Sequence, residues 1–184
     1  MLRLKYHINH MVNYELVARL NVKNIYKIPK KKYIIIQSSQ KKIIVDQTLF
    51  YPLYGCFELL ALQRPMLSVS KTAISAFQLR KNQVLGCQVT LRKLKADIFL
   101  DKLIFLYFPK IKAFNLYKYK LNKKNLTFAF GLNSIIPFED IENQYSKIDT
   151  NFGVNVFINF VNYQTKKSIN NLIYLSALQF PTIL

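Results

Sequence analysis

The sequence has no tryptophan, only four glycines and six prolines, and no long apolar run. Few glycines and prolines argue against low-complexity linkers, so we expect one domain over residues 1–184. The most concentrated apolar run, Leu103–Phe108, is far shorter than the roughly 18 residues that a membrane-spanning helix needs. Hydrophobic residues still make up 51% of the chain, which is enough for a core and excludes disorder as the reason for the charge.

Cysteine is also scarce, which excludes a disulfide framework. Cys56 and Cys87 lie far apart in the sequence and neither has a nearby cysteine partner, as a CxxC metal motif would require. His7 and His10 can share a helix face, so a metal set of two histidines and two cysteines is conceivable. A surface histidine pair and two buried thiols is the preferred interpretation.

Acidic residues number nine against 27 lysines and arginines, which gives a formal net charge of +18. Residues 1–124 contain 24 bases and 5 acids, whereas residues 125–184 contain 3 bases and 4 acids. This distribution predicts one side that faces a polyanion and another that faces something else. The cations are scattered over strands, loops and helix ends instead of lining an amphipathic helix, so nucleic acid is favoured over a membrane surface.

Motifs for catalysis are missing, because the chain has neither a glycine-rich phosphate loop nor an HExxH motif. Glu139, Asp140 and Glu142 cluster, and a metal-dependent RNA-processing enzyme is the alternative that they raise. A solvated or protein-facing acidic turn is the simpler interpretation. We therefore expect no enzyme activity, no cofactor and no bound metal.

Hydrophobic periodicity predicts helices over residues 7–20, 49–62, 95–108 and 165–178, and strands over 33–38, 66–70, 85–92, 126–132 and 152–161. Pro52 is tolerable in the first turn of the second helix, and Pro109 is expected to end the third. The first helix should turn the following residues inward: Ile8, Met11, Val12, Leu16 and Leu20. Helices mixed with mainly antiparallel strands predict an α+β fold.

The segment 71–83 joins two of these strands and carries three bases, no acid and one aromatic residue, Phe77. A flexible cationic arm on a rigid sheet can reach a phosphate surface away from the domain body. The other interpretation of this segment, an ordinary solvated hairpin loop, is given about the same weight as the cationic arm. Residues 110–124 interleave lysines with Phe114, Tyr117 and Tyr119, and this loop can either stack bases or pack back on the body.

Several short motifs follow one another in this region and further downstream. They are Arg64–Pro65, Ser75–Phe77, Leu79–Arg80, Gly86–Cys87, Val89–Arg92, Pro109–Phe114, Gly131, Ile135–Ile141, Gly153–Asn155 and Leu178–Pro181. Through them the chain closely resembles the universal large-subunit ribosomal protein family that binds 5S rRNA, the L-five family. The resemblance covers about residues 20–181.

The resemblance implies an antiparallel sheet with helices packed on one face and a projecting basic arm. It implies a structural protein of the central protuberance that joins 5S rRNA to large-subunit rRNA. The arm is expected near the P-site tRNA, and another surface is expected to bridge to a small-subunit head protein beside further protein neighbours. The alternative is a large-subunit rRNA-binding protein of a mitochondrial ribosome that lacks 5S rRNA.

The resemblance also assigns binding residues. The 5S rRNA contact falls to Gln37, Gln63 and Thr90, whose side chains each offer a donor and an acceptor. Gln37 replaces the family's asparagine, and Asn82 replaces a glycine, although asparagine tolerates the left-handed conformation. The tRNA-facing arm would carry Phe77, Arg80, Lys81 and Asn82. Phosphate contacts are expected from Lys31, Lys32, Arg64, Lys71, Arg92, Lys110 and Lys112.

The chain is rich in Ile, Asn, Lys, Phe and Tyr, whose codons are AT-rich. Its N-terminus lacks a signal-peptide apolar region and the long Arg/Ser-rich run of a transit peptide. Both features are expected of a product encoded in an organellar genome. We therefore expect a mitochondrial ribosome, with a plastid or an AT-rich bacterium as alternatives.

Overall fold

The computed structural model describes residues 3–111, 119–122, 127–144, 152–161 and 168–181. The chain divides into two compact units, each assembled from separate stretches of sequence. Unit 1 contains residues 1–34, 92–130 and 157–184, and unit 2 contains residues 35–91 and 131–156. The single domain expected from the sequence stays a prediction.

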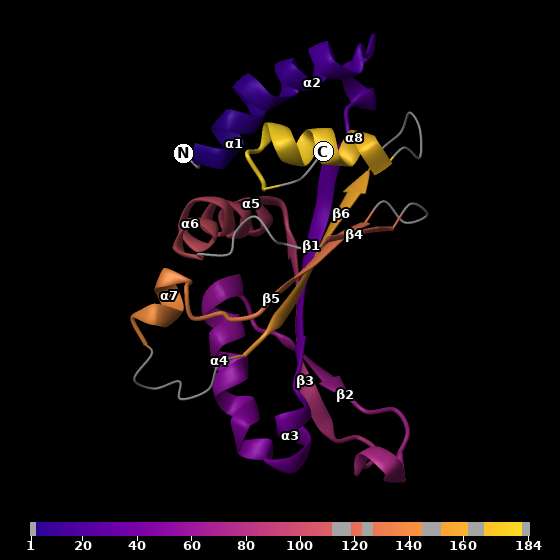
Figure 1. The fold of residues 1–184 in the computed structure, drawn as a ribbon, viewed down its shortest axis with the longest axis vertical. Coiled ribbons are helices and arrows are strands. Elements are labelled where there is room, and N and C mark those ends of the chain that lie inside the picture. The colour runs from indigo at the N-terminus through magenta and orange to yellow at the C-terminus, as the bar shows by residue number, and fades with distance from the viewer. Residues whose placement is uncertain (1–2, 112–118, 123–126, 145–151, 162–167, 182–184) are drawn as a thin grey trace. The chain divides into compact units, whose positions relative to one another are not determined.

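The strands form a six-stranded sheet in the order β2-β3-β1-β6-β5-β4 (Figure 1). They are β1 (Lys30–Ser39), β2 (Met66–Val69), β3 (Val84–Arg92), β4 (Tyr119–Asn122), β5 (Thr127–Leu132) and β6 (Val154–Val161). β2 pairs antiparallel with β3, with an irregularity between Ser68 and Val69, and β4 pairs antiparallel with β5. With the helices, this sheet confirms the α+β class.

The first helix of unit 1 consists of α1 (Arg3–His7), a π-helical turn (Ile8–Val12) and α2 (Asn13–Leu20). Leu4, Val12 and Leu16 are its buried side chains, whereas Met11 is 61% exposed, so the predicted inward position of Met11 is wrong. The buried residues keep a spacing of four or a multiple of four. Because that spacing overshoots an α-helical turn by about 40°, the wider π turn helps to hold them on one side.

A second long helical segment of unit 1 runs through α5 (Lys93–Lys102), a π-helical turn (Leu103–Tyr107) and α6 (Phe108–Lys110). The prediction that Pro109 ends this segment is wrong, because Pro109 lies in the first turn of α6. Proline removes one N–H here, but the segment ends at Lys110, the next residue, so little helix remains for it to disrupt.

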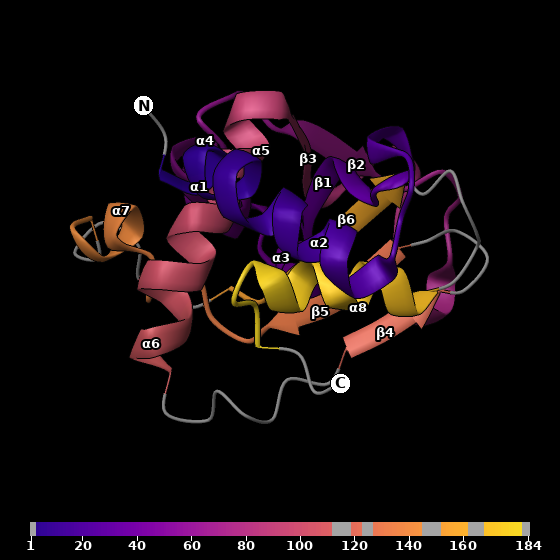
Figure 2. The same cartoon turned by 90° about the horizontal axis from the view of Figure 1, so that it is seen from above.

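The C-terminal helix α8 (Ser168–Ala177) lies beside α2 in both views (Figures 1 and 2), and α1 contacts α5. The core of unit 1 includes an aromatic cluster around Phe180, which follows α8. The Phe180 ring centroid lies 5.1 Å from that of Phe108, 5.5 Å from Phe128 and 5.4 Å from Phe130. These separations are in the range of favourable aromatic pairs, so Phe180 joins the segment after α8 to the core.

Unit 2 contains α3 (Lys41–Val45), α4 (Phe50–Ala61) and α7 (Glu139–Glu142), and α4 contacts α7. Pro52 lies in the first turn of α4 as predicted. The helix α3 lies where the sequence analysis predicted neither a helix nor a strand. Cys56 and Cys87 are both buried and free, which confirms the interpretation as buried thiols.

No helix in the described part of the chain is long and apolar enough to cross a membrane.

Candidate nucleic-acid interface

Two of the predicted 5S rRNA-binding residues lie on the side of unit 2's strands that faces away from the core. In β1, Ile36 and Ser38 are buried and Gln37 between them is half-buried. In β3, Val89 and Leu91 are buried and Thr90 between them is half-buried. Because side chains alternate along a strand, Gln37 and Thr90 point away from the buried positions of their strands.

Gln63 is joined to Thr90 by a hydrogen bond. Its side-chain Nε2 donates to the backbone carbonyl of Thr90 over 3.0 Å. Leu62, just before it, takes the left-handed conformation (φ 52°) at the end of α4 and turns the chain out of the helix. This bond occupies one Gln63 donor and no side-chain atom of Thr90. The bond therefore holds the Gln63 side chain beside Thr90 and leaves the Gln63 Oε1 atom and the Thr90 hydroxyl out of this contact.

The predicted phosphate-contacting residues fall into different settings. Five of them are exposed, namely Arg64, Lys71, Lys32, Arg92 and Lys110. In unit 1, Lys32 Nζ of β1 and Arg92 Cζ at the end of β3 each lie 5.9 Å from the centroid of the Tyr33 ring. Two cations therefore lie near one aromatic ring. Lys112 lies outside the described residues, as does most of segment 110–124. The prediction that this segment is a loop is wrong at Tyr119–Asn122, which form β4.

Lys31 differs from its neighbours because it is paired inside unit 1. Its Nζ atom contacts Asp97 Oδ1 of α5, and each of the two side chains is only 12% exposed. Burial lowers the pKa of Lys31 to about 7, so its charged form depends on the carboxylate beside it. We therefore leave Lys31 out of the proposed phosphate contacts.

The segment 71–83, called the arm here, is an exposed loop between β2 and β3 with hydrogen bonds of its own. Ile74 and Leu79 exchange two backbone hydrogen bonds of 3.1 Å each, and Ser75–Phe77 forms a 3₁₀ turn. At the arm's base, Ser70 N donates to Gln83 O, and Asn82 N donates to Ser70 O. Asn82 has φ 62°, so the expected left-handed turn is present without a glycine.

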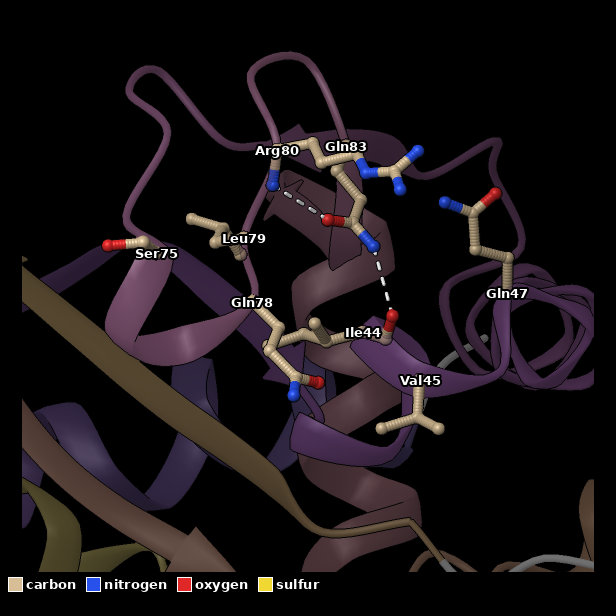
Figure 3. Close-up of a pocket in the computed structure, with 8 residues that line it drawn as sticks. All are labelled: Ile44, Val45, Gln47, Ser75, Gln78, Leu79, Arg80 and Gln83. Carbon is tan, nitrogen blue, oxygen red and sulfur yellow. Dashed lines mark hydrogen bonds between the residues drawn. The ribbon is translucent and has the colours of Figure 1, made fainter.

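The arm is anchored to α3 by Gln83 (Figure 3). Gln83 Nε2 donates to the Ile44 carbonyl over 3.0 Å, while its Oε1 accepts from the Arg80 backbone N–H, also over 3.0 Å. A pocket of about 650 Å³ opens here between arm and helix. Its lining residues are Ile44, Val45, Gln47, Ser75, Gln78, Leu79, Arg80 and Gln83. Sequence analysis missed Gln83, and no local motif points to it.

The acidic residues Glu139, Asp140 and Glu142 lie on the short helix α7. Among the described residues, no group of three or more His, Cys, Asp or Glu side chains is placed to hold a metal ion.

Known proteins resemble this chain over most of its length. The model of the C-terminal part of the ribosomal L-five family matches residues 84–182. A large ribosomal subunit protein named uL5m, from Reclinomonas americana, is 31% identical over 179 residues, which are 97% of each chain. The chain belongs to the ribosomal L-five family. A large ribosomal subunit protein named uL5, from Nitrosomonas eutropha, is 30% identical over 181 residues, 98% of each chain. As a member of this family, the chain is a structural ribosomal protein and not an enzyme.

Proposed function

We propose that this L-five family protein binds 5S rRNA in the large ribosomal subunit through Gln37, Gln63 and Thr90. In this role it holds 5S rRNA to large-subunit rRNA in the central protuberance. The arm faces the P-site tRNA through Phe77, Arg80, Lys81 and Asn82, and another surface meets a small-subunit head protein. The uL5m relative supports a mitochondrial ribosome, and so does the abundance of residues whose codons are AT-rich.

One observation carries the 5S proposal, namely the hydrogen bond from Gln63 to the Thr90 carbonyl. It restrains the Gln63 side chain beside Thr90 before any RNA arrives, so less of the freedom of that side chain is lost on binding. The Gln63 Oε1 atom and the Thr90 hydroxyl suit 2′-hydroxyls and base edges of RNA. Basic side chains such as those of Arg64 and Lys71 add an attraction to phosphates that does not depend on RNA sequence.

Binding of the purified chain to its cognate 5S rRNA, against a scrambled RNA of equal length across a salt series, tests the proposal. Wild type should prefer 5S rRNA, and the preference should persist as salt rises. Thr90→Val should weaken 5S binding by roughly 1–3 kcal/mol because an RNA group loses its partner. Arg64→Ala should instead lower the salt slope by about one.

Thr48→Val is the matched control, because Thr48 is exposed in the same unit but lies outside the site. If Thr90→Val and Thr48→Val bind 5S rRNA equally well, Thr90 has no role in recognition. Equal, steeply salt-dependent binding of wild type to both RNAs would favour the alternative, in which the chain binds large-subunit rRNA of a ribosome without 5S rRNA.

A further inference from the structure

The N-terminal helix of unit 1 carries three ring side chains on its outer side. Each ring lies two residues along the helix from a buried position. Tyr6 lies two residues from Leu4, His10 lies two from Val12, and Tyr14 lies two from both Val12 and Leu16. Two residues correspond to about 200° around a helix, so the rings point away from the core. Tyr6 is 54% exposed and Tyr14 is 71% exposed.

These rings are arranged as a surface. The centroids of Tyr6 and His10 lie 4.2 Å apart with the planes inclined by 35°, so one ring partly stacks on the other. Tyr14 follows four residues later along the same side. The helix beneath them is held by contacts of α1 with α5 and of α2 with α8 (Figures 1 and 2). The backbone that carries the rings is therefore fixed by packing.

The charges around this surface are suited to a polyanion. Glu15 is the only acidic residue before Asp46 in the sequence, and Arg19 holds it at 2.6 Å. Asp101 of α5 is held by Arg3 at 3.1 Å. Lys5 and Lys23, by contrast, are exposed and have no ion-pair partner among the described residues. In the described part of the chain, the helix thus offers an unpaired cation at Lys5, the segment after it offers another at Lys23, and Glu15, the helix's one acidic residue, is paired.

We propose that Tyr6, His10 and Tyr14 form a stacking surface for unpaired bases of an rRNA segment. Aromatic rings beside lysines bind single-stranded RNA because every base can stack and every phosphate is attracted. A protein partner with carboxylates could use the same rings, but the chain's large positive charge favours RNA. The inference rests on the proposed rRNA-binding function and adds a second contact, in unit 1, to the Gln63–Thr90 site of unit 2.

The test compares two probes on the full-length chain by fluorescence anisotropy: an oligouridylate, whose bases are unstacked, and a fully paired RNA duplex of equal length. The double substitution Tyr6→Ala and Tyr14→Ala should weaken oligouridylate binding about tenfold or more, because stacking is lost at two rings. Binding of the duplex should stay within about twofold, since every cation is kept. The double phenylalanine variant should bind oligouridylate like wild type.

Tyr51→Ala is the matched control, because Tyr51 is 75% exposed on α4 of unit 2. Unchanged oligouridylate binding by the double alanine variant would overturn the proposal, and so would an equal loss for both probes. Loss of co-sedimentation with large subunits without loss of oligouridylate binding would also overturn it and indicate a protein partner. Selectivity for 5S rRNA, measured in parallel, reports separately on the Gln63–Thr90 site and should be unaffected by the tyrosine changes.

Discussion

Gly86 of β3 lies directly against the backbone carbonyl of Ser38 in β1. A Cβ atom added to Gly86 would overlap the Ser38 carbonyl oxygen, and the Ser38 carbonyl carbon and the Ser39 Cα would lie 2.9 Å from it. All of these atoms belong to the backbone, which cannot rotate away as a side-chain end can. The strands can therefore approach this closely only because residue 86 has no side chain.

Gly86→Ala should destabilise the protein by about 1–3 kcal/mol or more, since one strand must shift to admit the methyl group. Gly55→Ala is the control, because Gly55 lies within helix α4 and a Cβ atom added to it would have no other atom within 4 Å. Replacing a helical glycine by alanine should stabilise by roughly 0.5–1 kcal/mol. Urea denaturation midpoints measure both changes, and equal midpoints for the two variants would contradict the close approach.

Lys31→Met should destabilise by about 3–5 kcal/mol, because it leaves the Asp97 carboxylate buried without a partner. Changing both residues, Lys31→Met with Asp97→Leu, should restore stability to about the wild-type value or above it. Arg19→Met, which breaks the exposed pair with Glu15, should cost about 0.5 kcal/mol or less. Chemical denaturation of the four proteins decides this, and a double variant as unstable as Lys31→Met would mean that the unpaired Asp97 carboxylate is not the cause of the loss.

Replacing Arg80 and Lys81 by alanine should spare 5S rRNA binding and weaken engagement of P-site tRNA. Both residues lie on the exposed arm, whereas the proposed 5S contacts lie on the strands and just after α4. The double change Lys27→Ala and Lys30→Ala removes equal charge in unit 1 and is the control. Filter binding of 5S rRNA and tRNA binding to reconstituted subunits are the two measurements. Parallel losses of both would make the arm part of the 5S site.

The two buried thiols should make stability fall at alkaline pH. Burial raises the pKa of Cys56 to about 11, and burial together with the charge of Cys56 raises the pKa of Cys87 to about 12. Between about pH 9 and these values the unfolded chain loses protons that the folded chain keeps, so unfolding becomes easier as pH rises. A double alanine variant should show a smaller fall between about pH 8 and 10 in urea titrations. An identical fall in both proteins would show that the thiols titrate normally.

Long periodic elements could be predicted from the sequence, because their patterns depend on burial of one side. The strands around the arm differ from prediction by about one residue, and α4 by a similar margin. Helix α3 was missed because five residues are too few to show a helical period. Met11 was misplaced because the π-helical turn changes the phase of an otherwise regular pattern.

The site depends more on contacts between distant residues, which a single sequence does not reveal. Gln63 and Thr90 were assigned by family resemblance, but the hydrogen bond between them spans 27 positions. The pairing of Lys31 with Asp97 spans 66 positions and distinguishes Lys31 from the neighbouring lysines of the same run. Asn82 was predictable, because its left-handed turn is local and asparagine accepts it.

The anchoring of the arm by Gln83 has a consequence for the entropy of binding. A free loop of this kind would lose about 1–2 kcal/mol for each residue whose backbone becomes fixed on a partner. Here the bond to Ile44 and the paired Ile74 and Leu79 restrict the loop in advance. Much of this backbone entropy is therefore already lost when the protein folds. A partner of the arm then binds a loop whose conformation is already close to the bound one.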